Sequence, residues 1–288
     1  MSAIKTENLS FFYNEDDKMR EAAIQNVNIE IEKGELVGII GHTGSGKSTL
    51  VKHLNGLLKP NGGKVYIDSQ DIWSEGVNLR DIRFKVGLVF QYPEYQLFEE
   101  TVYKDIAFGP KNMGLSEEEI RERVLEAAEF TGVSEEMLRK SPFELSGGQK
   151  RRVAIAGVIA MNPEILILDE PAAGLDPKGR DKILSQIKNY QEVKKNTVLL
   201  VSHSMEDIAK LATKVLVLEN GRVFSYDTVE NTFKKADELS KIRLSVPQIT
   251  EVFLKLREEG IELPESIFTV EYAKKSLLSL IGKGENNA

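Results

Sequence analysis

Three short apolar runs in the chain are typical of strands buried on both faces of a parallel sheet. They are ELVGII, EILILD and TVLLVSH, at residues 35–40, 164–169 and 197–203. A different pattern precedes the first run, where Val27, Ile29 and Ile31 alternate with polar residues as in a strand with one buried face. Farther along, Asn220-Gly221 separates VLVLE from RVFSY and predicts a hairpin with a type I′ turn.

Apolar residues with helical spacing, and residues that cap helices, lie between these predicted strands. Leu50, Leu54, Leu57 and Leu58 predict a helix that ends at KPNGG, residues 59–63. Other helix starts are predicted at a capping box of Ser116 with Glu119, at Ser146, at Asp176-Pro177 and at Ser204. This alternation predicts an α/β fold with a mainly parallel sheet that is covered on both faces.

Changes of pattern divide the chain into regions. Residues 1–225 form the predicted α/β unit, and the helical pattern at about 92–162 predicts a helical subdomain inserted into it. Residues 226–288 predict a small helical appendage, in which one helix opens at Pro247. The final sequence KGENNA predicts disorder.

Composition and charge narrow the classes of protein to consider. The chain has 288 residues, of which 41% are hydrophobic and 29% charged, as in ordinary globular proteins. No apolar window approaches roughly 18 residues, so no membrane span is expected, and the N-terminal sequence lacks a signal-peptide core. The absence of cysteine excludes disulfides and fits a cytosolic protein. A net charge of −7 argues against nucleic acid as a partner and against a polybasic membrane anchor.

The sequence GHTGSGKST, residues 41–49, has the spacing of a P-loop. In such a loop backbone N–H groups surround phosphate, the lysine reaches the terminal phosphates and the serine hydroxyl holds Mg²⁺. A flexible glycine-rich turn is the alternative, but the predicted strand before the loop and helix after it are the context that a P-loop requires. The predicted phosphate-binding residues are Gly41, His42, Thr43, Gly44, Ser45, Gly46, Lys47, Ser48 and Thr49.

The sequence LSGGQ, residues 145–149, places a serine cap and two glycines at a predicted helix start. Free N–H groups and the positive end of the helix dipole would face an anion there. An ordinary capped turn is the alternative, but the P-loop elsewhere in the chain favours a second phosphate-binding helix terminus. The predicted contacts are Ser146, Gly147, Gly148 and Gln149.

Polar residues end several predicted strands, at the edge where an open α/β sheet binds ligands. Asp169 is placed there to hold Mg²⁺, and Glu170 to orient or deprotonate a water. Gln91, which ends VGLVFQ, could ligand Mg²⁺ and the attacking water, and His203 could donate to a γ-phosphate. Tyr13 ends the first strand and could stack on adenine. The alternatives are a plain acidic turn for Asp169 and Glu170, an ordinary core or surface histidine, and simple packing of the tyrosine.

These motifs occur in the order found in ATP-binding cassette (ABC) ATPases, which the chain resembles over residues 3 to about 225. The sequence AGLD at 173–176 adds to the resemblance, whereas Ala172 stands where the family often has a threonine. The resemblance implies an ATPase with a RecA-like parallel sheet core, an N-terminal antiparallel β part and an inserted helical subdomain. It also implies that two cassettes pair head to tail, so that LSGGQ of one completes the ATP site of the other.

The resemblance also assigns roles to individual residues. The implied catalytic residues are Glu170 as base, His203 as γ-phosphate switch, Lys47 and Gln91. The resemblance implies that Ser48, Gln91 and Asp169 hold Mg²⁺. ATP contacts the P-loop and the LSGGQ motif, its adenine stacks on Tyr13, and Asp176 lies at the dimer interface.

Within the ABC ATPases the chain looks like the ATP-binding subunit of an energy-coupling factor (ECF) transporter, an importer of vitamins or of cobalt and other transition-metal ions. HLNGLLKP, FQYPEYQLFEETVYKDIAFGP, SPFELSGGQKRRVAIAG and the helical tail carry this resemblance, which favours the second of two paralogous ATPases. The implied partners are the paralogous ATPase or a second copy of the chain, a membrane-embedded scaffold that binds roughly Tyr92–Thr101, and separate substrate-binding membrane subunits. The implied location is peripheral, at the cytoplasmic face of the cell membrane, with the appendage as a dimer contact.

Other functions compete with this interpretation. The chain could serve another ABC importer, or it could be a non-transport ABC protein that acts on DNA or ribosomes, although its acidic charge disfavours the latter. A P-loop kinase for a small molecule has no use for LSGGQ, and a plain binding module would not fill every catalytic position. The resemblance implies that a separate membrane subunit recognises the transported substrate.

Overall fold

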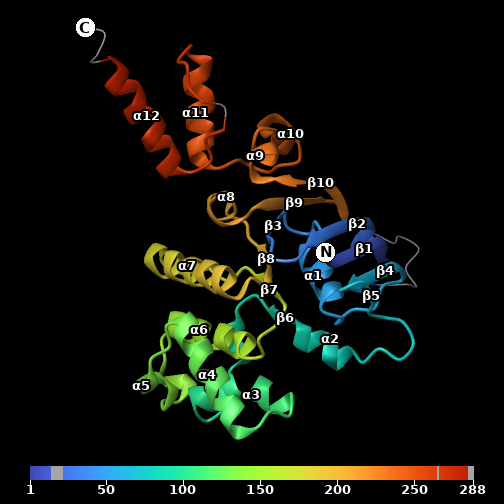
Figure 1. Cartoon of the computed structure of the whole chain (residues 1–288). Coiled ribbons are helices and arrows are strands. Elements are labelled where there is room, and N and C mark those ends of the chain that lie inside the picture. The colour runs from blue at the N-terminus through green and yellow to red at the C-terminus, as the bar shows by residue number, and fades with distance from the viewer. Residues whose placement is uncertain (14–21, 265, 285–288) are drawn as a thin grey trace.

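The computed structural model describes residues 1–13, 22–264 and 266–284 as an α/β protein with two β-sheets (Figure 1). The larger sheet contains β3 (Leu36–Ile40), β6 (Val86–Val89), β7 (Ile165–Asp169), β8 (Thr197–Val201), β9 (Lys214–Glu219) and β10 (Arg222–Thr228). Its strand order is β10-β9-β3-β8-β7-β6, and all neighbours are parallel except β10 and β9. The latter two form the predicted hairpin, in which Asn220 and Gly221 both have positive φ, 47° and 75°.

The smaller sheet is antiparallel and lies beside the larger one (Figure 1). It contains β1 (Ser2–Phe11), β2 (Ile24–Glu32), β4 (Gly62–Ile67) and β5 (Gln70–Asp71), in the order β2-β1-β4-β5. The predicted alternation in β2 is confirmed, because Val27, Ile29 and Ile31 are buried while the residues between them are exposed. One face of this sheet therefore supplies a core and the other faces solvent.

Alternate residues of the central strands enter two different cores. Ile165 and Ile167 of β7 pack with the smaller sheet and with α1 (Lys47–Leu54), which follows the P-loop. Leu166 and Leu168 face the other way and pack against helices. The parallel sheet is thus covered on both faces, as predicted, with the smaller sheet joining α1 on one of them.

A group of helices lies between β6 and β7 in the chain and forms the lower part of Figure 1. Two predictions within it are confirmed: Ser116 and Glu119 form a capping box, and Gly132 ends the same helix with φ 64°. The elements are η1 (Pro93–Gln96), α3 (Val102–Asn112), α4 (Glu117–Thr131), α5 (Glu135–Leu138), η2 (Pro142–Glu144) and α6 (Gly147–Ile159).

The remaining helices follow β7 and complete the chain. They are α7 (Pro177–Lys194), α8 (Met205–Leu211), α9 (Val229–Phe233), α10 (Ala236–Lys241), α11 (Gln248–Glu258) and α12 (Val270–Gly284). In Figure 1, α11 and α12 extend away from the two sheets. They share a small core of their own, formed by Phe253, Leu263, Ile267 and Ala273. The predicted disorder of KGENNA is wrong for its first two residues, because Lys283 and Gly284 belong to α12; residues 285–288 lie outside the described residues.

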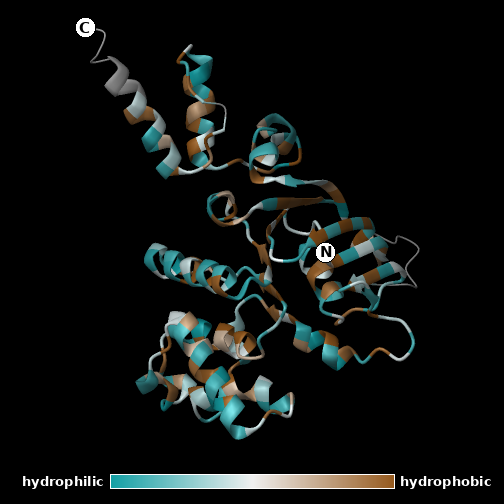
Figure 2. Ribbon diagram, in the orientation of Figure 1, coloured by the Kyte–Doolittle hydropathy of each residue, from teal (hydrophilic) through white to brown (hydrophobic). Residues whose placement is uncertain are grey.

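Hydropathy follows this arrangement. In Figure 2 the central strands are largely brown, the colour of hydrophobic residues, whereas much of α7 is teal. In the part of the chain that the structure describes, no helix is both long and apolar enough to cross a membrane.

Two elements near the P-loop differ from the prediction. The helix expected to include Leu57 and Leu58 ends at Leu54, because Gly56 adopts φ 69° and turns the chain. A helix that the pattern did not predict, α2 (Leu79–Lys85), begins at Asn78, whose side chain accepts a hydrogen bond from the backbone N–H of Arg80.

Candidate functional site

The carboxyl ends of four parallel strands place the predicted catalytic residues at one edge of the larger sheet. β3 leads into the P-loop, and Asp169 is the last residue of β7. Gln91 and His203 each lie two residues beyond the strands expected to contain them, β6 and β8. Because these strands are parallel neighbours, the four segments meet at the same edge.

The P-loop has a backbone conformation that requires glycine. Gly46 has φ 100°, and a Cβ atom there would lie 2.6 Å from the carbonyl oxygen of Ala23 and 2.8 Å from Cγ2 of Ile24. Gly44 has φ 84°, and a Cβ atom there would meet no other atom within 4 Å. The loop is therefore held tightly where it joins α1 and open at Gly44, which leaves room for a ligand against its backbone.

Lys47 is a buried cation that forms no close ion pair with any carboxylate that the structure describes. Its side chain is 7% exposed, and the Nζ atom donates to the carbonyl oxygens of Gly41 at 2.7 Å and His42 at 3.0 Å. In the described chain no carboxylate lies within ion-pair distance of Nζ. Burial lowers the pKa of Lys47, against the smaller opposing effects of the Glu170 and Asp169 charges. A buried ammonium whose hydrogen bonds in the described chain go to two carbonyls fits a site for an anion such as phosphate.

Ser48 and Asp169 form a pair of oxygen ligands that fits Mg²⁺. The hydroxyl of Ser48 donates to Oδ2 of Asp169 at 2.9 Å, and Asp169 is 7% exposed. A hydroxyl and one carboxylate suit Mg²⁺, which completes its coordination with phosphate and water oxygens. Within the described ranges no group of three or more His, Cys, Asp or Glu residues could hold a metal, so an all-protein cage is absent there.

Glu170 is a buried carboxyl group with a free oxygen. Its backbone has φ 54°, and its buried Oε1 atom has no hydrogen-bond partner among the described residues. Burial, followed by the charge of Asp169, raises the pKa of Glu170 to about 7, against the opposing effects of Lys47 and of the backbone N–H of His203. A carboxyl group with a pKa near neutrality can accept a proton from water at physiological pH.

The His203 ring lies beside this carboxyl group. Its Nε2 atom is 3.5 Å from Oε1 of Glu170, too long for a good hydrogen bond, and half of its side chain is exposed. Burial, with a smaller effect of Lys47, lowers the pKa of His203, so the ring is neutral near pH 7. A neutral ring at the edge of the site can still donate one N–H to a ligand.

Tyr13 does not end a strand, which corrects the sequence interpretation. β1 ends at Phe11, and Tyr13 lies two residues later with 59% of its surface exposed. Its ring packs edge-on against Phe11, with centroids 5.0 Å apart, and its hydroxyl lies 3.0 Å from Oγ1 of Thr49. The tyrosine is therefore exposed and tied to the first turn of α1, where a base could stack.

The LSGGQ motif forms an exposed helix start that is separate from the P-loop. Ser146 caps α6, accepting from the N–H of Gln149 at 3.4 Å, while the Gln149 side chain accepts from the N–H of Ser146 at 2.9 Å. A Cβ atom at Gly147 would meet nothing within 4 Å. In Figure 1, α6 lies among the lower helices, away from α1, so its exposed N-terminus is available to a ligand held by another molecule.

The segment from Asp176 into α8 contains a contact that the sequence pattern did not predict. Asp176 occupies the N-cap position of α7, but its side chain makes no capping hydrogen bond and is exposed. Nearby, Nε of Arg180 lies 3.0 Å from both carboxylate oxygens of Asp207, which joins α7 to α8. This pair fixes the position of the segment that follows His203. Its two residues are 27 positions apart, so no local sequence pattern predicts the bond.

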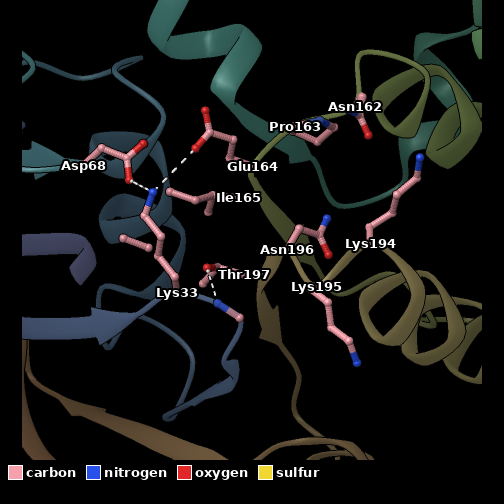
Figure 3. A pocket seen from close by; sticks show the side chains of 12 residues that line it. Lys33, Asp68, Asn162, Pro163, Glu164, Ile165, Lys194, Lys195, Asn196 and Thr197 are labelled. Carbon is pink, nitrogen blue, oxygen red and sulfur yellow. Dashed lines mark hydrogen bonds and ion pairs between the residues drawn. The ribbon is translucent and has the colours of Figure 1, made fainter. Parts of the chain in front are cut away.

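A separate pocket of about 280 Å³ lies at the opposite edge of the sheet, where β7 and β8 begin (Figure 3). Its charged residues are largely neutralised within the chain, since Nζ of Lys33 lies 2.6 Å from Asp68 and 3.8 Å from Glu164. It contains none of the predicted site residues. The pocket is therefore distinct from the candidate site.

Comparison with known proteins agrees with this geometry. A family model described as ABC transporter matches residues 24–173, and a shorter match to an AAA domain, putative AbiEii toxin, Type IV TA system, covers 140–208. The energy-coupling factor transporter ATP-binding protein EcfA2 of Caldanaerobacter subterraneus subsp. tengcongensis is 57% identical over 99% of both chains. The EcfA2 protein of Clostridium tetani is 55% identical, again over 99% of both.

Solved structures are similar as well. The structure of cbiO1 from Clostridium perfringens, part of the ABC transporter complex cbiONQ, aligns with a TM-score of 0.74 and 38% identity over 88% of this chain and 98% of that one. The dimeric structure of MJ0796, a bacterial ABC transporter cassette, aligns with a TM-score of 0.69 and 34% identity over 78% and 98%. The chain therefore belongs to the ABC transporter ATPases and, among them, to the energy-coupling factor ATP-binding proteins of the EcfA2 type.

Proposed function

We propose that the chain binds and hydrolyses ATP as one of two cassettes of an ECF-type importer for vitamins or transition-metal ions. It acts at the cytoplasmic face of the cell membrane, bound to membrane-embedded subunits. The observation that carries the chemistry is the meeting of Lys47, the Ser48–Asp169 pair and the buried carboxyl group of Glu170 at one sheet edge. The EcfA2 relatives support the transport role.

The proposed roles follow from these contacts. Lys47 and the P-loop amides bind the phosphates, and Glu170 accepts a proton from the attacking water. His203, beside Glu170, donates to the γ-phosphate, and Tyr13 stacks on adenine. Mg²⁺, when bound to Ser48 and Asp169, neutralises charge on the phosphate oxygens, and Gln91 adds a ligand.

A second cassette completes the site. LSGGQ lies apart from the P-loop of its own chain, and its helix start is exposed. An anion at this helix start must therefore come from another molecule, which is a paralogous ATPase or a second copy of the chain. The dimeric MJ0796 cassette is a precedent for such pairing. The γ-phosphate holds the two cassettes together and its loss releases them.

The membrane-embedded scaffold binds the docking segment, which we define as Tyr92–Thr101. This segment carries large apolar side chains that a monomer leaves exposed: Tyr95 is 84% exposed and Phe98 is 58% exposed. Phe108 of α3, 44% exposed, packs edge-on against Phe98 with centroids 5.0 Å apart and extends the surface. Clustered exposed aromatic residues are typical of a protein interface.

Phosphate release from ATP, measured without any added acceptor, tests the proposed chemistry. The chain, purified with its partner cassette, should release phosphate only when Mg²⁺ is present. Phosphate transfer that requires a small-molecule acceptor would instead indicate a kinase and would exclude this proposal.

A further inference from the structure

Arg151 lies in α6, shortly after the LSGGQ motif, and the fold buries it together with its partner Glu94. The two side chains are 3% and 14% exposed. Nε of Arg151 donates to Oε2 of Glu94 at 3.0 Å, and Nη2 donates to Oε1 at 2.6 Å. Such a two-bond fork fixes orientation as well as distance, so η1 is held rigidly against α6.

The same guanidinium reaches the segment that follows Glu170. Its Nη1 atom donates to the carbonyl oxygen of Pro171 at 3.4 Å and to that of Ala173. The ring of Tyr92 lies 5.9 Å from the guanidinium carbon and covers it. One side chain therefore joins three segments: helix α6, which begins at the LSGGQ motif, the segment after the proposed base Glu170, and the docking segment.

The docking segment is held at a second point. Oδ1 of Asp105, in the first turn of α3, accepts hydrogen bonds from the backbone N–H groups of Phe98 at 3.2 Å and Glu99 at 3.3 Å. Between the two anchors, Tyr95 points its side chain into solvent, 84% exposed. A partner that presses on this outer surface would displace the inner side, where Glu94 lies.

We propose that Arg151 is a positioning residue that transmits docking of the membrane subunit to the ATP site; the inference rests on the proposed function above. Separating Arg151 from Glu94 would leave a charge buried without a partner, so the pair stays closed when the docking segment moves. The displacement therefore carries α6, with the LSGGQ motif, and the segment after Glu170 in the same direction. Movement of the docking segment at the membrane is thereby coupled to alignment of the LSGGQ motif with ATP.

Glu94→Gln tests the inference, because it keeps the shape of the side chain and removes its charge. Glu136→Gln is the matched control: Glu136 lies outside the docking segment, in α5, and pairs with Lys140 at 2.6 Å, but the pair is exposed. The probe is ATP, and phosphate release is measured from the paired cassettes with and without the membrane subunits in detergent. Co-purification and thermal melting show that each variant docks and folds.

The expected result is that Glu94→Gln still co-purifies with the membrane subunits, while the change in rate that they cause shrinks about fivefold or more, a typical coupling between sites. Glu136→Gln should keep that change within about twofold, as for an exposed pair. Arg151→Lys keeps the charge but loses the two-bond fork, so it should reduce the response to the membrane subunits as much as Glu94→Gln does. The double variant should reduce that response no further than either single variant.

Two results would overturn the inference. One is an unaltered response of Glu94→Gln and Arg151→Lys to the membrane subunits. The other is loss of those subunits from Glu94→Gln, which would make Glu94 a docking contact. If the wild-type cassettes themselves did not respond to the membrane subunits, the proposed function would fail, and the inference with it.

Discussion

The hydroxyl of Ser48 lies 2.9 Å from Oδ2 of Asp169, although the two residues are 121 positions apart. The P-loop and the end of β7 meet at this contact, at the carboxyl edge of the parallel sheet.

We predict that Ser48→Ala lowers the apparent affinity for Mg²⁺ in ATP hydrolysis by about tenfold or more, because one oxygen ligand is lost. Titration of phosphate release with Mg²⁺ measures it. Ser185→Ala, on exposed α7, is the control, and equal Mg²⁺ curves for both variants would contradict the assignment.

Lys47→Met removes the charge of the side chain but keeps its apolar length, so it distinguishes a role in hydrolysis from a role in stability. Hydrolysis should fall about 100-fold or more, as when a group that stabilises the transferring phosphoryl is removed. The melting temperature without nucleotide should not fall, because the cost of burying the charge outweighs its attraction to Glu170 and Asp169. Lys52→Met on the same helix should leave the rate nearly unchanged. A large loss of thermal stability in Lys47→Met would show that the lysine is mainly structural.

Glu170→Gln should stop hydrolysis while preserving ATP binding. Loss of a general base lowers rates by about 10²–10⁴-fold, so the ATP-bound pair of cassettes should accumulate. Size-exclusion chromatography with ATP and Mg²⁺ should show this pair in the variant and little of it in the wild type. Hydrolysis at the normal rate by the variant would mean that another group is the base.

The same substitution should alter stability in a pH-dependent way in buffer free of nucleotide and Mg²⁺. The pKa of Glu170 is raised from its usual 4.5 to about 7, so the folded state disfavours the charged form. The stability that the neutral Glu170 side chain contributes to the folded state is fully present below pH 4.5 and is lost as the pH rises through about 7. Neutral glutamine avoids that loss, so Glu170→Gln should be more stable by up to about 3 kcal/mol at pH 8.5 and by less at pH 5.5. Denaturant unfolding at both pH values measures it, and a difference independent of pH would contradict the raised pKa.

The outer surface of α12 should contribute to pairing of the cassettes. Leu278 is 57% exposed there, so Leu278→Asp should not affect the melting temperature of the isolated chain. It should weaken the paired state, which light scattering at several concentrations can measure, by about tenfold if the leucine is buried on pairing. Ser279→Asp, also at an exposed position of α12, adds the same charge and is the control. Pairing that is unaffected by Leu278→Asp would exclude this surface of α12 as the contact.

Much of the fold is predictable because its signals are local. The buried strand β7 appears as the run ILILD, the hairpin turn as Asn-Gly, and the start of α4 as a capping box. The helix α2 was missed although a local signal existed, Asn78 before Leu79 with Asp81 in the first turn. The length of α1 was overestimated because the spacing of Leu57 and Leu58 outweighed the glycine between them and Leu54.

The candidate site was predictable where motifs carry its residues, and less so where tertiary contacts do. The P-loop and Asp169 follow from sequence, because a strand end fixes their place at the sheet edge. The bond between Arg151 and Glu94 does not, because KRR in a helix has the appearance of an exposed basic run and its partner is 57 residues away. Burial of such a cation depends on the packing of distant segments, so the hydrophobic periodicity of the sequence does not predict it.

Purification of the tagged chain from its own membranes in mild detergent tests the central claim most directly, with every retained protein identified. The account predicts a second ABC ATPase together with polytopic membrane proteins, among them a scaffold and smaller substrate-binding subunits. Loss of the polytopic proteins when Tyr95 is replaced by Asp, with the second ATPase retained, would place the docking surface as proposed. Recovery of the chain alone, or with ribosomes or DNA, would contradict the transporter assignment and leave only the ATPase.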